Sequence, residues 1–156
     1  MQTTVLFDGK LQIYIPDDFS HADESEAAEI YPSLERPQVI FANAGFSRFL
    51  TFSLLDKLVS ADETLSVAKE IRKLIWSLYP HSLLSEAVFI RFGNLRCGGF
   101  FFRTGTKESQ IYNIMCAVSF ENRLLLVTYG CGMDDEDGKV LFRKLFAKAE
   151  YIGVEK

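Results

Sequence analysis

The feature that most constrains this chain is a set of β-prone segments that are apolar on both faces. In Phe100–Phe102 every side chain is aromatic, so no strand orientation leaves one face polar. A sheet with one wet face alternates apolar and polar residues, whereas a sheet covered on both faces does not. We therefore expect a sheet with a helix packed on each face. The 14 phenylalanines, against one tryptophan, indicate a bulky aromatic core.

Turn signals and side-chain preferences divide the chain into eight expected strands. These are expected at residues 4–7, 11–15, 38–42, 48–55, 86–92, 96–104, 110–119 and 124–131. Asp8-Gly9 favours a tight two-residue turn between the first two, because this dipeptide adopts positive φ readily. The order predicts two hairpins followed by a four-stranded meander.

Helices are expected at residues 22–31, 61–79 and 134–149. Ser60 and Glu63 have the spacing of a capping box, and four acidic residues from Asp134 to Asp137 suit a helix N-terminus. One face of the middle helix is apolar, formed by Leu65, Ala68, Ile71, Ile75 and Leu78. These elements predict a single α+β domain over residues 1–156, built on an antiparallel sheet covered by helices on both faces.

Composition argues against several classes of function. The net charge is −4 and there is no run of Lys or Arg, so we expect no nucleic-acid partner. No apolar stretch reaches the roughly 20 residues of a membrane helix, and we expect no membrane partner. The N-terminal residues lack the pattern of a signal peptide, and the three cysteines form no Cys-x-x-Cys pair. We therefore expect a cytoplasmic protein.

Several partial motifs favour structural interpretations over chemical ones. Gly130-x-Gly132 lacks the third glycine of a dinucleotide fingerprint, and too few residues follow it for the remaining unit. The acidic run before Gly138 does not fit the ligand positions of a calcium loop. Ser47 lies between strands, unlike a hydrolase nucleophile, and Cys97, Cys116 and Cys131 lack the spacing of a zinc site. We expect no catalytic residues, no metal site and no cofactor, and hence no enzyme.

One charged segment stands out as a candidate surface. Residues 17–29 hold six acidic side chains and no Lys or Arg. A solvated loop and helix would explain such a run; the functional interpretation is a docking patch for a basic partner. The candidate partner-binding residues are Asp23, Glu24, Glu26 and Glu29.

The order of elements over residues 4–152 resembles the Mog/PsbP-like superfamily. The resemblance begins with a hairpin ending in Ile15-Pro16-Asp-Asp-Phe19 and closes with Tyr151-Ile152 after the last helix. It implies an α/β/α sandwich around an antiparallel sheet. Members include a Ran-binding import factor, a photosystem II subunit and bacterial chaperones of secreted effectors, and what they share is protein binding without catalysis.

These observations lead to one main hypothesis and two others. We expect a cytoplasmic, bacterial protein-interaction module, such as an adaptor, a chaperone or an immunity-type protein, whose partner is another protein. The second hypothesis is a small-molecule-binding protein or an enzyme of unrecognised type, with a pocket between sheet and helix. The third is a homodimer formed through an exposed sheet edge. Between monomer and homodimer the sequence does not decide.

Overall fold

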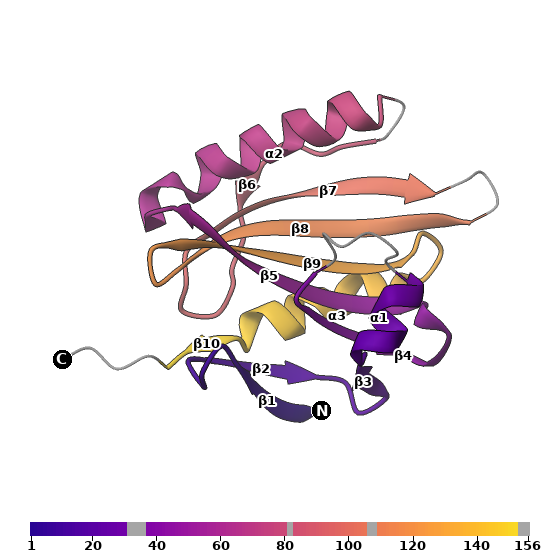
Figure 1. Cartoon of the computed structure of the whole chain (residues 1–156). Coiled ribbons are helices and arrows are strands. Elements are labelled where there is room, and N and C mark those ends of the chain that lie inside the picture. The colour runs from indigo at the N-terminus through magenta and orange to yellow at the C-terminus, as the bar shows by residue number, and fades with distance from the viewer. Residues whose placement is uncertain (31–36, 81–82, 106–108, 153–156) are drawn as a thin grey trace.

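The computed structural model describes residues 1–30, 37–80, 83–105 and 109–152, apart from the side chains of residues 29 and 30. It contains a seven-stranded and a three-stranded sheet, both antiparallel (Figure 1). The larger sheet has the order β3 (Phe19–His21), β4 (Val39–Asn43), β5 (Arg48–Leu58), β9 (Arg123–Gly132), β8 (Gln110–Phe120), β7 (Cys97–Gly105) and β6 (Val88–Phe89). The smaller sheet has the order β1 (Gln2–Leu6), β2 (Leu11–Ile15) and β10 (Glu150–Tyr151). The expected α+β class and antiparallel sheet are confirmed.

The helices are α1 (Glu24–Ile30), α2 (Thr64–Leu78) and α3 (Glu136–Ala147), with short 3₁₀ turns η1 (Ala44–Phe46) and η2 (Ala61–Glu63). The predicted capping box is present: Glu63 Oε1 accepts from the backbone N–H of Ser60 at 3.0 Å. It caps η2, from which α2 continues directly, so the helical segment begins where the sequence predicts.

Helix α2 packs on β7 and β8 of the larger sheet. Its Val67 and Ala68 share a buried cluster with Phe100 of β7 and Ala117 of β8. The approach is close, because a Cβ at Gly98 would lie 2.6 Å from the carbonyl oxygen of Thr64. A glycine in β7 thus lets the helix backbone lie directly against the strand.

A second and larger cluster contains residues of α3 and of the three-stranded sheet. Along β8 its members Cys116 and Val118 flank Ala117, which belongs to the α2 cluster. Successive residues of a strand point to opposite faces, so the two clusters lie on opposite sides of β8. Helix α3 contacts β9 of the larger sheet and β2 of the smaller one (Figure 1).

The first hairpin departs from the expected geometry. Leu6 pairs with Leu11, so four residues form the turn, and Phe7, Asp8 and Gly9 all have positive φ. The expected two-residue turn is therefore wrong. The hairpin also stays out of the main sheet and pairs through β2 with β10. Leu11, Ile13 and Ile15 nevertheless face the core, as their alternation predicts.

Three further differences have local causes. The expected strand at 86–92 is reduced to Val88–Phe89: the pairing with β7 shifts by one residue before Val88, and Phe92 already bridges to Leu95 in the following turn. Strand β3 was not predicted, since three residues give too little periodicity to detect. Leu78 was placed on the buried face of α2 but is 61% exposed, because the stripe packed on the sheet ends at Ile75.

Candidate interaction surfaces

The described residues bring together no recognisable reactive centre. Among residues 1–30, 37–80, 83–105 and 109–152, no three His, Cys, Asp or Glu side chains are placed to hold a metal ion. Cys97, Cys116 and Cys131 are all free and buried. Burial raises the pKa of the Cys131 thiol to about 11 and raises that of Cys116 well above its ordinary range. Buried neutral thiols of this kind are poor nucleophiles.

Asp135, which lies between the glycines at the end of β9 and the start of α3, connects β5 to the N-terminus of α3. Arg48 of β5 donates from Nε to Asp135 Oδ2 at 2.7 Å and from Nη2 to Asp135 Oδ1 at 2.8 Å. Asp135 also caps α3, because its Oδ1 accepts from the backbone N–H of Gly138 at 2.9 Å. The hydrogen bonds from Arg48 hold the pKa of the Asp135 carboxyl below its ordinary value. The carboxylate is thus occupied by a guanidinium and a helix N-terminus.

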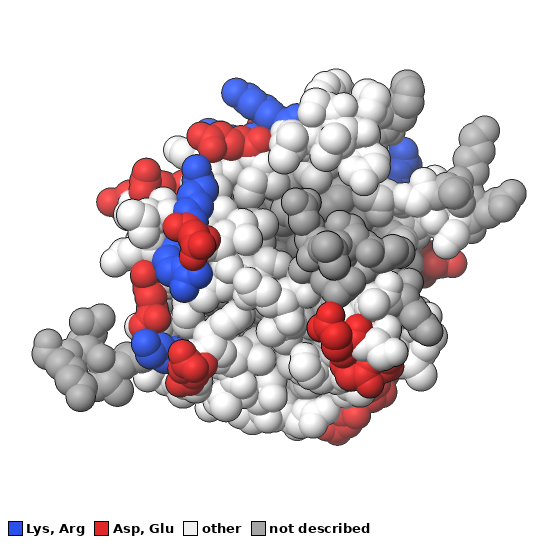
Figure 2. Space-filling model, in the orientation of Figure 1, with Lys and Arg blue, Asp and Glu red and all other residues white. Residues whose placement is uncertain are grey.

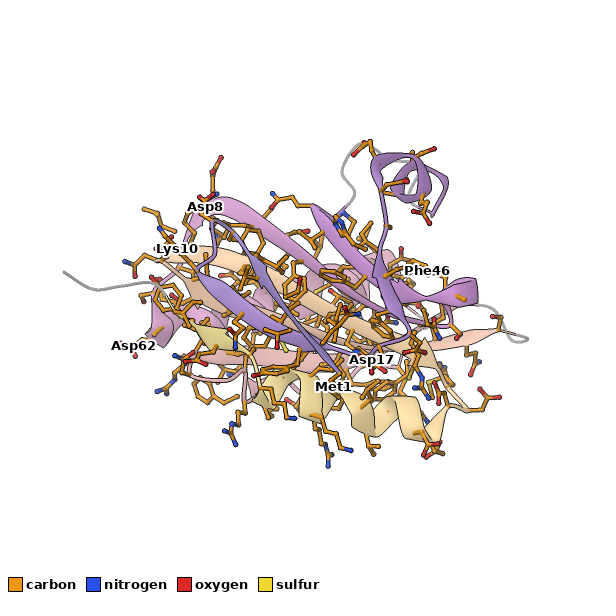
Figure 3. The ribbon with its side chains drawn as sticks, turned by 90° about the horizontal axis from the view of Figure 1, so that it is seen from below. Met1, Asp8, Lys10, Asp17, Phe46 and Asp62 are labelled. Atoms are coloured by element: carbon orange, nitrogen blue, oxygen red, sulfur yellow. The ribbon has the colours of Figure 1, made fainter. Side chains whose placement is uncertain are left out.

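Close contacts account for the glycines of this segment. A Cβ at Gly130 would lie 2.1 Å from the ring of Phe49, the residue that pairs with it across the strands. Phe49 in turn stacks on Phe46, labelled in Figure 3, with ring centroids 5.4 Å apart. At Gly138 a Cβ would lie 2.3 Å from Asp135 Oδ2. Packing therefore explains Gly130 of the partial dinucleotide motif and Gly138 of the acidic run.

The four candidate acidic residues lie on or just before α1. Asp23 and Glu26 form a reciprocal cap: Glu26 N–H donates to Asp23 Oδ1 at 2.8 Å, and Asp23 N–H donates to Glu26 Oε1 at 3.2 Å. Glu24 is exposed, and the side chain of Glu29 lies outside the described part of the chain. Figure 2 shows acidic atoms gathered around α1, whereas acidic and basic atoms alternate along the opposite rim. Two of the four residues thus have a structural role.

A different surface combines aromatic and basic side chains. Two hollows adjoin the segment Phe89–Arg91 at the β6 edge of the larger sheet, and we call them together the arginine groove. The first has a volume of about 420 Å³ and is lined by Phe89, Ile90, Arg91, Phe142, Arg143, Phe146 and Ala147. The second has a volume of about 380 Å³ and is lined by Phe89, Ile90, Arg91, Leu95, Arg96 and Cys97. Neither lining contains an acidic residue.

The arginines of this groove rest on aromatic rings. The guanidinium of Arg96 lies 4.5 Å from the ring centroid of Phe89, and that of Arg143 lies 5.9 Å from that of Phe142. Phe89 remains 50% exposed. In the part of the chain that the structure describes, the ion pairs are formed by basic groups other than those of the groove, among them Arg48 and Arg123. The groove therefore presents positive charge and apolar surface together on a chain whose net charge is −4.

Sequence reasoning missed this groove because its residues come from distant parts of the chain. Arg91 and Arg96 flank a turn, whereas Arg143 lies about fifty positions further on in α3. The available signal was weak: residues 38–133 are mildly basic in an otherwise acidic chain. A charge balance over a long segment does not show which side chains share a surface.

Comparison with known proteins gives matches in structure alone. No protein-family model matches the sequence, and a search of curated proteins finds no significant match. A cyanobacterial PsbP from Synechocystis is 14% identical, with a TM-score of 0.64 over 96% of this chain and 91% of that one. The yeast Ran-binding protein Mog1p, from Saccharomyces cerevisiae, is 9% identical, with a TM-score of 0.54 over 97% of this chain and 95% of that one. The chain has the Mog/PsbP-like fold.

A third structure, from Bacteroides thetaiotaomicron, has a TM-score of 0.64 at 9% identity. It matches 96% of this chain, which spans about half of the Bacteroides chain (47%). At these identities the likeness to all three structures concerns the fold. A scan of the described helices finds none with the length and apolar character to span a membrane.

Proposed function

We propose that this Mog/PsbP-like chain is a non-catalytic, single-domain protein-interaction module, acting as an adaptor, a chaperone or an immunity-type protein. The observation that carries the proposal is the arginine groove, where half-exposed Phe89 lies under Arg96 at the edge of a sheet. Exposed aromatic and arginine side chains are the types that dominate binding energy at protein interfaces. Mog1p, described as a Ran-binding protein, gives a precedent for protein partners on this fold.

The proposed architecture supports this use. We take the chain to be an α/β/α sandwich, in which α2 and α3 cover opposite faces of the larger sheet. Covered faces leave the sheet edge and the outer sides of the helices as the surfaces open to a partner. The arginine groove lies where the edge strand β6 meets α3.

The acidic residues of α1 form a second proposed docking patch, for a basic segment of a partner. Because Asp23 and Glu26 cap the helix, reversing their charge would disturb α1 itself. The informative variant is Glu24→Lys with Glu29→Lys, which leaves the cap intact. An unchanged affinity for an identified partner would remove this patch from the proposal.

Position-specific photocrosslinking tests the groove. A photoreactive phenylalanine analogue replaces Phe89 and, as the control, Val5 of β1, which is also about half exposed (52%). We expect a discrete crosslinked partner at position 89, absent at position 5 and lost when Arg96→Glu is added. Equal crosslinking at both positions, or none at position 89 in the source cells, would remove the groove as a protein-docking site.

A small-molecule role is the second candidate, and one observation favours it. The hollow between Ile90 and α3 is lined mainly by apolar atoms and, at about 420 Å³, falls within the range of ligand pockets. Arg91 and Arg143 would suit an amphipathic anion. A thermal-shift series with straight-chain carboxylates discriminates, because a ligand of the native state raises Tm with its concentration. A rise that saturates and is lost in Phe146→Ala would favour this role.

We also propose a cytoplasmic location in a bacterium. The support is chemical: three cysteines remain as free thiols in the structure, as is usual in reducing compartments. Fractionation of the source cells with an antibody against the chain tests the location. Recovery with the periplasmic or secreted fraction would contradict it.

A further inference from the structure

We propose that the arginine groove binds an extended segment of a partner protein as an additional strand beside β6, and that this segment alternates apolar and acidic residues. The inference rests on the proposed function, because it specifies the partner of the same groove. It draws on three independent features of the groove: the open edge of β6, the different side chains that flank the two faces of this edge, and the positive charge that no ion pair neutralises within the described residues.

The backbone of β6 offers the hydrogen bonds that an added strand needs. Strand β6 is the last strand of the larger sheet. The N–H of Ile90 donates to the carbonyl of Cys97 in β7 at 2.9 Å, and Phe89 is the residue before it. Because bonding direction alternates along an antiparallel strand, the N–H and C=O of Phe89 point away from β7. Within the described ranges, no hydrogen bond is formed by these two groups.

The two faces of this edge require different side chains from an added strand. Ile90 packs against the cluster that contains α3, whereas Phe89 pairs with Gly98, whose missing Cβ faces α2. Successive side chains of an added strand alternate in the same way. On the α3 side they would enter the apolar hollow, and on the other side they would lie beside Phe89 and Arg96.

The charge of the groove selects an acidic segment. Arg91, Arg96 and Arg143 bring three positive charges to the two hollows, which have no acid in their linings. Arginine binds carboxylates through paired hydrogen bonds, and complementary charge raises both association rate and specificity. Charged residues on an edge strand can also serve only to prevent aggregation; in that case the groove would bind no acidic strand, which the experiment below detects.

The test uses fluorescein-labelled heptapeptides and fluorescence anisotropy with the whole protein. The probe alternates glutamate and leucine. One control alternates lysine and leucine, and another has the probe's composition with the leucines in one block. We expect the alternating acidic peptide to bind at least about tenfold more tightly than either control. Arg96→Glu and Arg143→Glu should each weaken binding of the alternating acidic peptide about tenfold. The control Lys69→Glu makes the same charge change on the exposed side of α2, and it should change this affinity less than twofold.

The backbone contribution is tested at Phe89. Phe89→Ala removes the ring and keeps the backbone N–H. Phe89→Pro removes the ring and the N–H, but it breaks no hydrogen bond to β7, because this N–H points away from β7. We expect the proline variant to bind several-fold more weakly than the alanine variant. As a measurement independent of any variant's stability, saturating peptide should slow amide exchange at Phe89 in the unmodified protein at least tenfold, with little change at Val5.

Each result distinguishes this inference from the proposed function. Equal binding of the alternating and block peptides, or unchanged exchange at Phe89, overturns the added strand. A partner crosslinked at position 89 would then still support protein docking. Absence of any crosslinked partner at position 89 in the protein without Arg96→Glu removes the groove as a protein-docking site, whatever the peptides do. Light scattering that shows a dimer abolished by Phe89→Pro would make a second copy of this chain the occupant and overturn the acidic partner.

Discussion

The ion pair between Arg48 and Asp135 supports a quantitative prediction about stability. Arg48→Met should remove two charge-assisted hydrogen bonds while leaving the cap of α3 in place. Hydrogen bonds to charged groups contribute about 1.5–3 kcal/mol to folding. Both side chains are about a quarter exposed, at 27% and 26%, so we expect a loss near the lower end, about 1.5–2 kcal/mol.

Two substitutions of Asp135 separate the ion pair from the cap. Asp135→Ser keeps an oxygen for the N–H of Gly138 and should destabilise the protein about as much as Arg48→Met. Asp135→Ala also removes the cap, which contributes about 1 kcal/mol, so its total loss should approach 3 kcal/mol. For a protein of this length the corresponding falls in Tm are about 2–4 °C per kcal/mol. Urea unfolding followed by circular dichroism measures the differences.

The pH dependence gives an independent check. Arg48 lowers the pKa of Asp135 in the folded protein below the ordinary 3.8, so the pair stabilises the fold above that value. The advantage of the unmodified protein over Arg48→Met should therefore be full at neutral pH and disappear as the pH falls through 3.8 towards the folded pKa. A difference below about 0.5 kcal/mol at pH 7, or one that is constant down to pH 2, would refute the reasoning.

Three other sites give shorter predictions. Gly98→Ala should destabilise the protein by about 1–3 kcal/mol and speed amide exchange in α2, because its Cβ would meet the backbone of Thr64; unchanged exchange would contradict this packing. At pH 8 Cys131 should react with iodoacetamide only after unfolding, since a pKa of about 11 leaves about one thiol in a thousand ionised; fast labelling of the native protein would oppose it. Ser60→Ala should lower Tm at pH 7 by more than at pH 3, because the cap holds the pKa of Glu63 below its ordinary 4.5; an equal loss at both pH values would count against the capping box.

The sequence predicts elements well where local chemistry decides them. Alternation of Leu11, Ile13 and Ile15 locates β2 and its buried face, and Ser60 locates the start of the helical segment. It could not show that the first hairpin leaves the main sheet, because that pairing depends on residues 150 and 151, far along the chain. Nor could it show the shift beside β6, because residues 85–88 contain no glycine or proline to mark the irregularity.

The two candidate surfaces also differ in how far the sequence alone reveals them. The acidic residues of α1 are neighbours in the sequence, so composition alone finds them, but it does not distinguish capping by Asp23 and Glu26 from exposure. The arginine groove is formed when the turn after β6 approaches α3, and Arg91 and Arg143 then line one hollow. Such a surface follows from tertiary packing, which no local pattern encodes.

The pairing of β2 with β10 has a consequence for how the protein matures on the ribosome. Gln12 of β2 pairs with Glu150 of β10, so the first hairpin leaves the exit tunnel long before its last partner is translated. Until then the apolar side of β2 has neither α3 nor β10 against it. The native contacts of β2 can therefore form only after residues 136–151 have been translated, long after β2 itself.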